Sequence, residues 1–169
     1  MVDADGYRPN VGIVITNNCA QVFWARRVGG HNAWQFPQGG IDTGETPEQA
    51  LYRELQEETG LLPENVTLLG QTQDWLRYDL PAHMRRRHTD LTFIGQKQKW
   101  FLLRLDAPDD AVRLDIDTTP EFKDWKWVSY WYPISSVVDF KQQVYRSALS
   151  ELMAANLTKS KSRRRRRKR

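Results

Sequence analysis

The sequence is short of cysteine and contains no long apolar run. Cys19 is the single cysteine among 169 residues, so no disulfide can form within the chain, and no thiolate metal site is expected. No apolar stretch approaches the roughly 18 residues that cross a bilayer. Residues 1–5 lack the basic and apolar segments of a signal peptide. These absences argue against a disulfide scaffold and a membrane protein, and they predict a cytoplasmic location.

Acidic residues are missing from the last part of the chain, residues 159–169, which hold nine of the 25 basic residues. The other 16 basic residues are outnumbered by 21 acidic ones, so the rest of the chain carries about −5. Because such a basic segment cannot bury apolar area, we predict one domain over residues 1–157 and a disordered tail over residues 158–169. The tail could hold polyanions through phosphate contacts, and composition is equally consistent with a solvated extension that has no partner.

The remaining sequence is typical of a folded α/β domain, with 40% hydrophobic residues and seven tryptophans. Runs rich in β-branched and aromatic residues predict strands at 10–16, 21–27, 66–69, 72–78, 96–105 and 125–132. Four apolar residues at helical spacing predict a closing helix that packs on the core: Phe140, Val144, Ala148 and Leu152.

The strongest helix prediction covers residues 46–59. Thr46 can cap the helix, Pro47 suits its first position, and Gln49 completes a capping box. Gly60 follows as the expected stop. The apolar stripe of this helix consists of Ala50, Leu51 and Leu55.

Three carboxylates, Glu54, Glu57 and Glu58, share one face of this predicted helix because they are spaced i, i+3 and i+4. Like charges at this spacing repel one another, and partial burial increases the cost. A hard divalent cation such as Mg²⁺ or Mn²⁺ prefers carboxylate oxygens and would remove the repulsion. Taken alone, the spacing is also compatible with a solvated acidic surface.

These carboxylates belong to a longer pattern, Gly39-x5-Glu45-x7-Arg53-Glu54-Leu55-x-Glu57-Glu58-x-Gly60-Leu61. The pattern resembles the Nudix box at every defined position, so the chain is identified as similar to Nudix hydrolases. The resemblance implies an α/β/α sandwich with a mixed β-sheet. It also implies an enzyme that hydrolyses phosphoanhydride bonds with Mg²⁺ or another divalent cation such as Mn²⁺.

Roles follow from the resemblance by matching positions. It implies a catalytic set of Glu54, Arg53 and Glu58, with Glu54 the favoured general base, and Glu45 as a structural partner of Arg53. The implied metal ligands are the carbonyl of Gly39 and the side chains of Glu54, Glu57, Glu58 and Glu121.

Seven segments that flank the carboxylate helix resemble the bacterial members of this family that act on RNA 5′ ends: 5–12, 34–40, 75–78, 95–101, 119–122, 127–133 and 137–141. This likeness implies conversion of a 5′-triphosphate RNA end to a 5′-monophosphate with release of pyrophosphate, a step that promotes mRNA decay. The expected substrate-binding residues are Arg8, Arg27, Tyr78, Gln96, Lys97, Lys99, Val138, Phe140 and Lys141. Arginine can pair with phosphate, and aromatic rings can stack on an exposed base. Gln96, Lys97 and Lys99 are expected to face the active cleft from one strand.

Each of these assignments has a plainer alternative. Arg27 can be a surface cation, Phe140 an anchor of the last helix and Tyr78 an ordinary sheet residue. Two rival functions also stay open: a hydrolase of dinucleoside polyphosphates such as diadenosine tetraphosphate, and an RNA-binding module that has lost catalysis. The intact Glu54, Glu57 and Glu58 favour an enzyme over the second rival.

Overall fold

The computed structural model describes residues 2–30, 32–85, 87–88 and 91–168. Eight strands form one sheet: β1 (Tyr7–Thr16), β2 (Gln21–Arg27), β3 (Trp34–Gln35), β4 (Gln38–Gly40), β5 (Val66–Gln71), β6 (Leu76–Asp79), β9 (Gly95–Leu105) and β10 (Phe122–Ser129). A separate two-stranded ribbon is made by β7 (Arg87–His88) and β8 (Leu91–Thr92). The helices are α1 (Pro47–Thr59), α2 (Tyr132–Ser136) and α3 (Gln142–Arg167), and short 3₁₀ turns include η4 (Asp139–Lys141).

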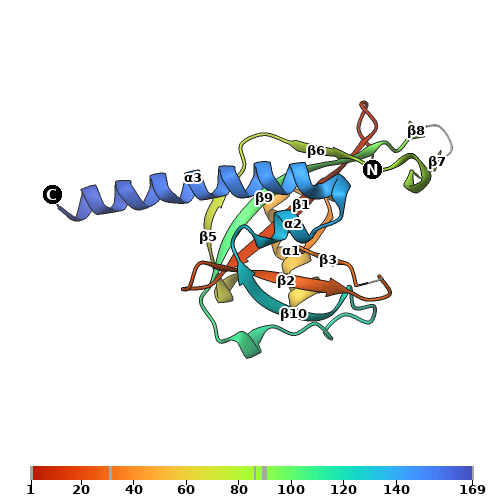
Figure 1. Ribbon diagram of the computed structural model, residues 1–169. Coiled ribbons are helices and arrows are strands. Elements are labelled where there is room, and N and C mark those ends of the chain that lie inside the picture. The colour runs from red at the N-terminus through yellow and green to blue at the C-terminus, as the bar shows by residue number, and fades with distance from the viewer. Residues whose placement is uncertain (1, 31, 86, 89–90, 169) are drawn as a thin grey trace.

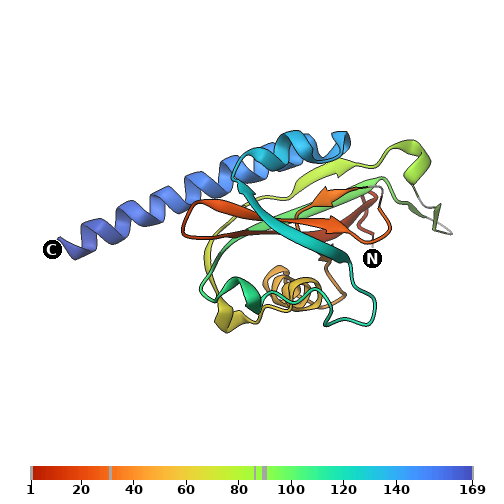
Figure 2. The same ribbon diagram turned by 60° about the horizontal axis from the view of Figure 1, so that its bottom comes forward.

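The sheet is mixed, with the main order β10-β2-β1-β9-β5. Strands β1 and β9 run parallel at its centre, whereas β1 pairs antiparallel with β2 and β4, and β6 pairs antiparallel with β9. Helix α1 covers one face, while α2 and α3 cover the other (Figure 2). This arrangement confirms the predicted α/β/α sandwich with a mixed sheet.

Each face of the sheet has its own core, because successive residues of a strand point to opposite faces. On the α1 side, Ile13 and Phe23 pack with the predicted helix stripe of Leu51 and Leu55. On the α3 side, Trp24, Phe36, Trp100 and Tyr145 form a cluster of edge-to-face and tilted rings.

Helix α1 has the ends that its sequence predicts. Thr46 and Gln49 form the reciprocal capping box, and Pro47 occupies the first turn. Gly60 closes the helix in the left-handed region, at φ 72°. A side chain at Gly60 would also collide with Ile116 and Arg113, so glycine is required there twice over. The helix that carries the carboxylates is therefore fixed at both ends by local chemistry.

Two predicted strands differ from the structure. Residues 72–78 contain strand only from Leu76, and the strand predicted over 125–132 ends at Ser129. Trp131 then takes helical backbone angles, and Pro133 lies in the first turn of α2, where its fixed φ suits a helix. This turn redirects the chain toward Val138, Phe140 and α3.

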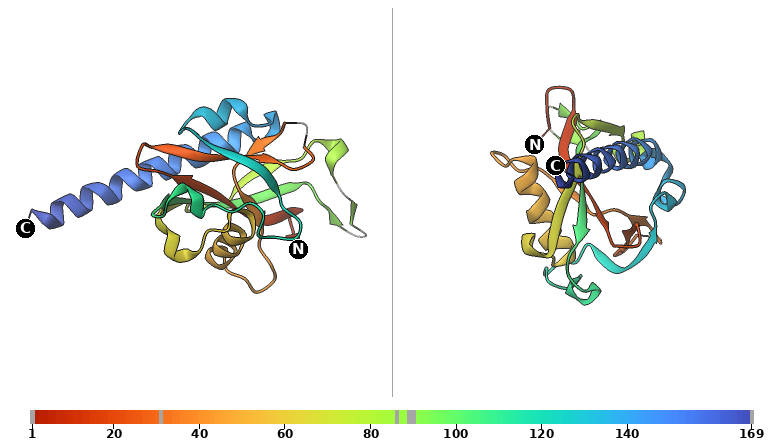
Figure 3. Two further views of the ribbon diagram at one scale, coloured as in Figure 1. Left: turned by 90° about the horizontal axis from the view of Figure 1, so that it is seen from below. Right: turned by 90° about the vertical axis from the view of Figure 1, so that its left-hand side faces the viewer.

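In the structure, helix α3 runs through the basic tail as far as Arg167, and Arg169 lies outside the described residues. No glycine or proline follows Gln142, and Ala, Leu, Lys and Arg are good helix formers. Ala155 still packs against Gly70 of β5. Beyond it the helix projects away from the sheet (Figures 1 and 3). Within the described part, no helix combines the length and apolarity needed to cross a membrane.

Candidate active site

Two carboxylates of α1 are turned inward under the glycine-containing strand β4. Glu54 is 9% exposed and Glu58 is 8% exposed, one helical turn apart. The backbone amide of Gln38 donates to Glu58 Oε2 at 3.2 Å. A side chain at Gly39 would overlap the carboxylate of Glu54, so this glycine permits the backbone to lie directly on the acid group.

This burial is electrostatically costly. Burial raises the pKa of Glu54 above its ordinary value of 4.5, although Arg53 opposes the rise. Burial raises the pKa of Glu58 further, and repulsion from Glu54 and Glu121 adds to it. The two acids therefore form a strained pair that a positive charge would relieve.

Arg53 supplies part of that charge. Its guanidinium donates to both oxygens of Glu45, at 2.8 and 2.9 Å, and to Glu54 Oε1 at 2.7 Å. It also donates to the carbonyl of Gly40 at 2.7 Å. Glu45 is the largest cause of the raised pKa of Arg53. The predicted pairing of Glu45 with Arg53 is thus confirmed, and Arg53 ties the helix to β4.

The oxygen donors around this pair fit a hard divalent cation. Glu54 and Glu58 are buried and mutually repelling, the Gly39 backbone lies against Glu54, and Glu57 stands at the rim with a side chain that is 46% exposed. Glu121 pairs instead with Arg27, at 3.3 Å. Among the described residues, no three acidic or histidine side chains already converge on one point.

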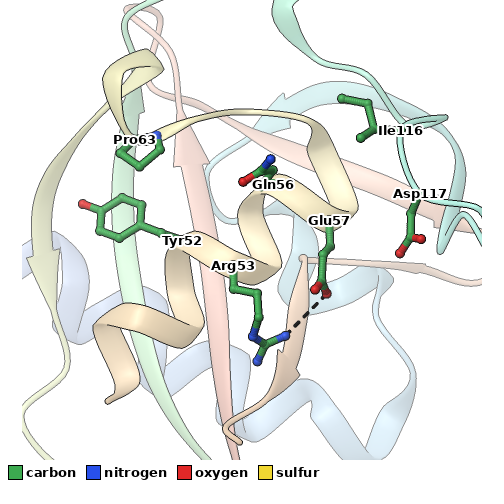
Figure 4. A pocket seen from close by; sticks show the side chains of 7 residues that line it. All are labelled: Tyr52, Arg53, Gln56, Glu57, Pro63, Ile116 and Asp117. Carbon is green, nitrogen blue, oxygen red and sulfur yellow. Dashed lines mark hydrogen bonds and ion pairs between the residues drawn. The ribbon is translucent and has the colours of Figure 1, made fainter. Parts of the chain in front are cut away.

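A pocket of about 530 Å³ adjoins the outer side of α1 (Figure 4). Arg53 and Glu57 stand at one side of it, joined by a contact of 3.4 Å. The residues that line the pocket are Tyr52, Arg53, Gln56, Glu57, Pro63, Ile116 and Asp117. Ile116 and Asp117 belong to the loop that continues to Glu121, so the pocket opens beside the carboxylates.

Gln38 connects the carboxylates to Lys141, and the buried amides of Gln35, Gln98 and Asn10 lie beside it. Lys141 Nζ donates to Gln35 Oε1 at 3.2 Å and to Gln38 Oε1 at 3.4 Å. Gln98 Nε2 donates to Asn10 Oδ1 at 2.8 Å. Gln38 therefore bonds Glu58 through its backbone and Lys141 through its side chain. Gln35, Gln38, Gln98 and Asn10 are absent from the residues predicted from sequence, and the glutamines of the Trp-Gln-Phe-Pro-Gln-Gly-Gly segment were the available signal.

Lys141 is nearly buried, and burial lowers its pKa from 10.5 to about 8. Repulsion from Arg27 lowers this pKa further, whereas Glu121 and Glu58 oppose the shift. Of the predicted base-binding residues, Tyr78 and Phe140 are brought to Lys141: their rings lie 5.9 Å apart, and the Lys141 ammonium is 5.7 Å from the Tyr78 ring. Tyr78 is buried beneath Phe140, and burial raises the pKa of Tyr78 to about 12.

Other predicted substrate-binding residues are divided between two faces. Gln96 points to the same face as Gln98, and its buried Oε1 has no hydrogen-bond partner among the described residues. Lys97 and Lys99 point to the opposite face, where their ammonium groups lie 4.7 and 5.2 Å from the ring of Trp75. The expectation that Gln96, Lys97 and Lys99 line one cleft is therefore wrong, because strand residues alternate in direction.

The contacts of Lys97, Lys99, Arg8 and Val138 complete the set of predicted substrate-binding residues. Lys97 is further held by Asp3, at 2.8 Å, and Lys99 donates to the carbonyl of Gln73. A side chain at Gly40 would meet the guanidinium of Arg8, which places Arg8 against β4. Val138 is half-exposed and precedes Phe140 in the segment between α2 and α3.

The buried ammonium gives a pH-dependent prediction. We expect Lys141→Met to raise the free energy of unfolding at pH 7 by about 1–3 kcal/mol, since each pKa unit corresponds to about 1.4 kcal/mol and two hydrogen bonds disappear. Below pH 8 the Lys141 ammonium is charged in both the folded and the unfolded state, so the folded protein bears the full free-energy cost of burying that charge. Between pH 8 and 10.5 only the unfolded chain keeps the proton, and the wild type gains stability.

Urea unfolding of both proteins at several pH values checks this expectation. The advantage of Lys141→Met should shrink as the pH rises above 8. The matched control is Lys123→Met at an exposed lysine, which should change stability little. An advantage that stays constant from pH 7 to pH 10 would contradict the assigned cost.

Known proteins share the sequence that forms this carboxylate site. The NUDIX domain model matches residues 6–147. The RNA pyrophosphohydrolase of Acinetobacter baylyi is 60% identical over 152 residues, covering 90% of this chain and 91% of the relative. That of Pseudomonas putida is 57% identical over 159 residues, covering 94% and 99%.

Solved structures show the same fold at lower identity. A Caenorhabditis elegans Ap4A hydrolase binary complex is 23% identical, with a TM-score of 0.64, over 89% of this chain and 98% of that one. The Escherichia coli dihydroneopterin triphosphate pyrophosphohydrolase is 22% identical, with a TM-score of 0.66, over 83% and 95%. The family model, the relatives and the carboxylate helix agree, and the chain belongs to the Nudix hydrolase family.

Proposed function

We propose that this Nudix hydrolase is an RNA 5′-pyrophosphohydrolase. It converts a 5′-triphosphate RNA end to a 5′-monophosphate, releases pyrophosphate and so promotes mRNA decay. The observation that carries the proposal is Gln38, which joins the buried carboxylate of Glu58 to the ammonium of Lys141. A phosphate-reacting group is thereby linked directly to a base-sized polar and aromatic site. The relatives named RNA pyrophosphohydrolase support the same substrate.

The proposed metal site consists of the Gly39 carbonyl with Glu54, Glu57, Glu58 and Glu121. A divalent cation there, Mg²⁺ or Mn²⁺, would neutralise phosphate charge and lower the pKa of an attacking water. Glu54 is the proposed general base, because its raised pKa brings it closer to the range in which a carboxylate accepts a proton. Arg53 positions that carboxylate by its bond at 2.7 Å.

The proposed RNA site lies on the other side of Gln38. Phe140, backed by Tyr78, offers a ring on which a base can stack, and Lys141 lies beside it to hydrogen-bond a base edge or phosphate. Arg27 adds positive charge at this site, next to Glu121. An RNA substrate and one exposed cysteine, Cys19, are consistent with a cytoplasmic location.

A dinucleoside polyphosphate is the second candidate substrate. Such a molecule needs room for a nucleoside on each side of the phosphates, and the pocket beside Tyr52 and Gln56 offers the second space. Hydrolysis of triphosphorylated RNA and of dinucleoside polyphosphates can use the same carboxylates, so the ratio of kcat/KM for the two substrates distinguishes the two functions.

The comparison that tests the function measures kcat/KM for a 5′-triphosphorylated dinucleotide RNA and for diadenosine tetraphosphate under one set of conditions with Mg²⁺. We expect the RNA to be preferred by at least about tenfold, roughly 1.4 kcal/mol of transition-state binding. Glu57→Gln serves as the control, because both activities must disappear if they belong to this site. A dinucleoside preference of several orders of magnitude would sink the RNA assignment.

The projecting end of α3 is proposed as an auxiliary RNA contact for the catalytic body, residues 1–157. Lys161, Arg163–Arg167 and Lys168 are exposed on a helix that leaves the sheet after Ala155 (Figure 1). They can hold phosphates of a long RNA through counterion release, without reading sequence. They lie at the far end of α3 from η4, the turn that contains Phe140, so a substrate of two nucleotides does not reach them (Figure 1).

Truncation after Asn156 tests this contact. We expect the truncated protein to bind a long triphosphorylated RNA about tenfold or more weakly at low salt, because nine cations are removed. The slope of log Kd against log salt should flatten by about 0.7 for each phosphate that the protein no longer neutralises. Turnover of the dinucleotide serves as the internal control and should stay within about twofold, roughly 0.4 kcal/mol. A large drop in dinucleotide turnover would refute a purely electrostatic role.

A further inference from the structure

A second cluster of aromatic and basic side chains lies on the α3-side face of the sheet, outside the site described above. Lys126 Nζ lies 4.5 Å from the centre of the Trp34 ring and 5.9 Å from that of Tyr132. The guanidinium carbon of Arg26 is 5.6 Å from the same Trp34 ring. Trp34, Lys126 and Tyr132 are called the Trp34 platform below.

Strand pairing explains why these residues meet. In the register of the sheet, Arg26 of β2 pairs with Trp34 of β3 on one side and with Asp124 of β10 on the other. Lys126 is two residues beyond Asp124 on β10 and therefore points to the same face. The indole of Trp34 thus extends over β2 to reach the Lys126 ammonium, and α2 begins at Tyr132 beside them.

The platform carries an available positive charge and an available ring. Arg26 is neutralised by Asp124, with which it forms a two-point ion pair. Lys126 is exposed and forms no ion pair among the described residues. Tyr132 is 44% exposed, which is high for a large aromatic residue and leaves its ring open to solvent. A cation beside open aromatic rings is the combination that proteins use to bind single-stranded nucleic acids, since bases stack and phosphates pair.

The platform is continuous with the proposed base site. Trp34 and Phe140 both pack against the apolar cluster on the α3 side of the sheet. Tyr132 is the first residue of α2, and Val138, two residues beyond its end, leads to Phe140. We propose that the Trp34 platform binds RNA nucleotides that lie downstream of the nucleotide at Phe140. This inference rests on the proposed function, because it requires RNA as the substrate.

The length of α2 sets the expected spacing. Five helical residues span about 7–8 Å, and each nucleotide of a stacked strand advances about 3.4 Å along the strand axis. The platform is therefore about two nucleotides beyond the base site. A triphosphorylated dinucleotide ends before it, whereas a hexanucleotide reaches across it.

The test compares KM for a triphosphorylated dinucleotide and a triphosphorylated hexanucleotide. For Tyr132→Ala we expect KM for the hexanucleotide to rise about five- to tenfold, from the loss of one stacked base. KM for the dinucleotide should stay within about twofold, and Tyr132→Phe, which keeps the ring, should restore the hexanucleotide value. Lys126→Gln should flatten the salt dependence of hexanucleotide binding by about 0.7 in the log–log slope.

Trp131→Ala is the matched control, because Trp131 is the neighbouring aromatic, is 47% exposed and contacts Tyr130 rather than a cation. It should leave both KM values unchanged. Equal KM changes for both RNA lengths would overturn the proposal, because the effect would then come from the catalytic site. Unchanged hexanucleotide binding in Tyr132→Ala and Lys126→Gln would also overturn it. Neither result would touch the proposed function, which the dinucleotide measures separately.

Discussion

The structure depends on the burial of two negative charges, Glu54 and Glu58, beneath the backbone of β4. Burial raises the pKa of both carboxylates, and the charge of Glu54 raises that of Glu58 further. The fold accepts this cost because α1 is fixed by its caps and by Arg53, which binds Glu45, Glu54 and the Gly40 carbonyl together. A site that holds repelling carboxylates in one place is ready for a divalent cation and its phosphate ligand.

Gln38 extends this constraint to the other side of the sheet. Its backbone bonds Glu58, and its side chain bonds Lys141, so the acid and the buried ammonium are positioned by one residue. The adjoining Phe140 and Tyr78 then place an aromatic surface at a fixed distance from the phosphate-reacting groups. This coupling through a short strand supports the proposed selectivity of the phosphate-hydrolysing box for a polyphosphate that carries a base.

The parts that could be predicted from sequence are those determined by local chemistry. The caps of α1 and the spacing of its three glutamates require no tertiary information, and the Nudix pattern supplied the fold. Gln96 is separated from Lys97 and Lys99 because they point to opposite faces of the sheet. Their positions in the sequence did not reveal which face borders the active site. Buried amides such as Gln98 have no periodic signature. The prediction for the tail used its charge composition alone. The same residues are also good helix formers without glycine or proline, and α3 continues through them.

The most direct test of the buried-charge account is thermal unfolding of the wild type and Glu58→Gln, each in chelator and in Mg²⁺. The account predicts that Glu58→Gln melts at a higher temperature in chelator, because a buried charge has been removed. It also predicts that Mg²⁺ at about 100 times its Kd stabilises the wild type by about 2.7 kcal/mol, roughly 5–10 °C, and the variant much less. A variant that is less stable in chelator and responds equally to Mg²⁺ would contradict the claim that this pair forms the metal site.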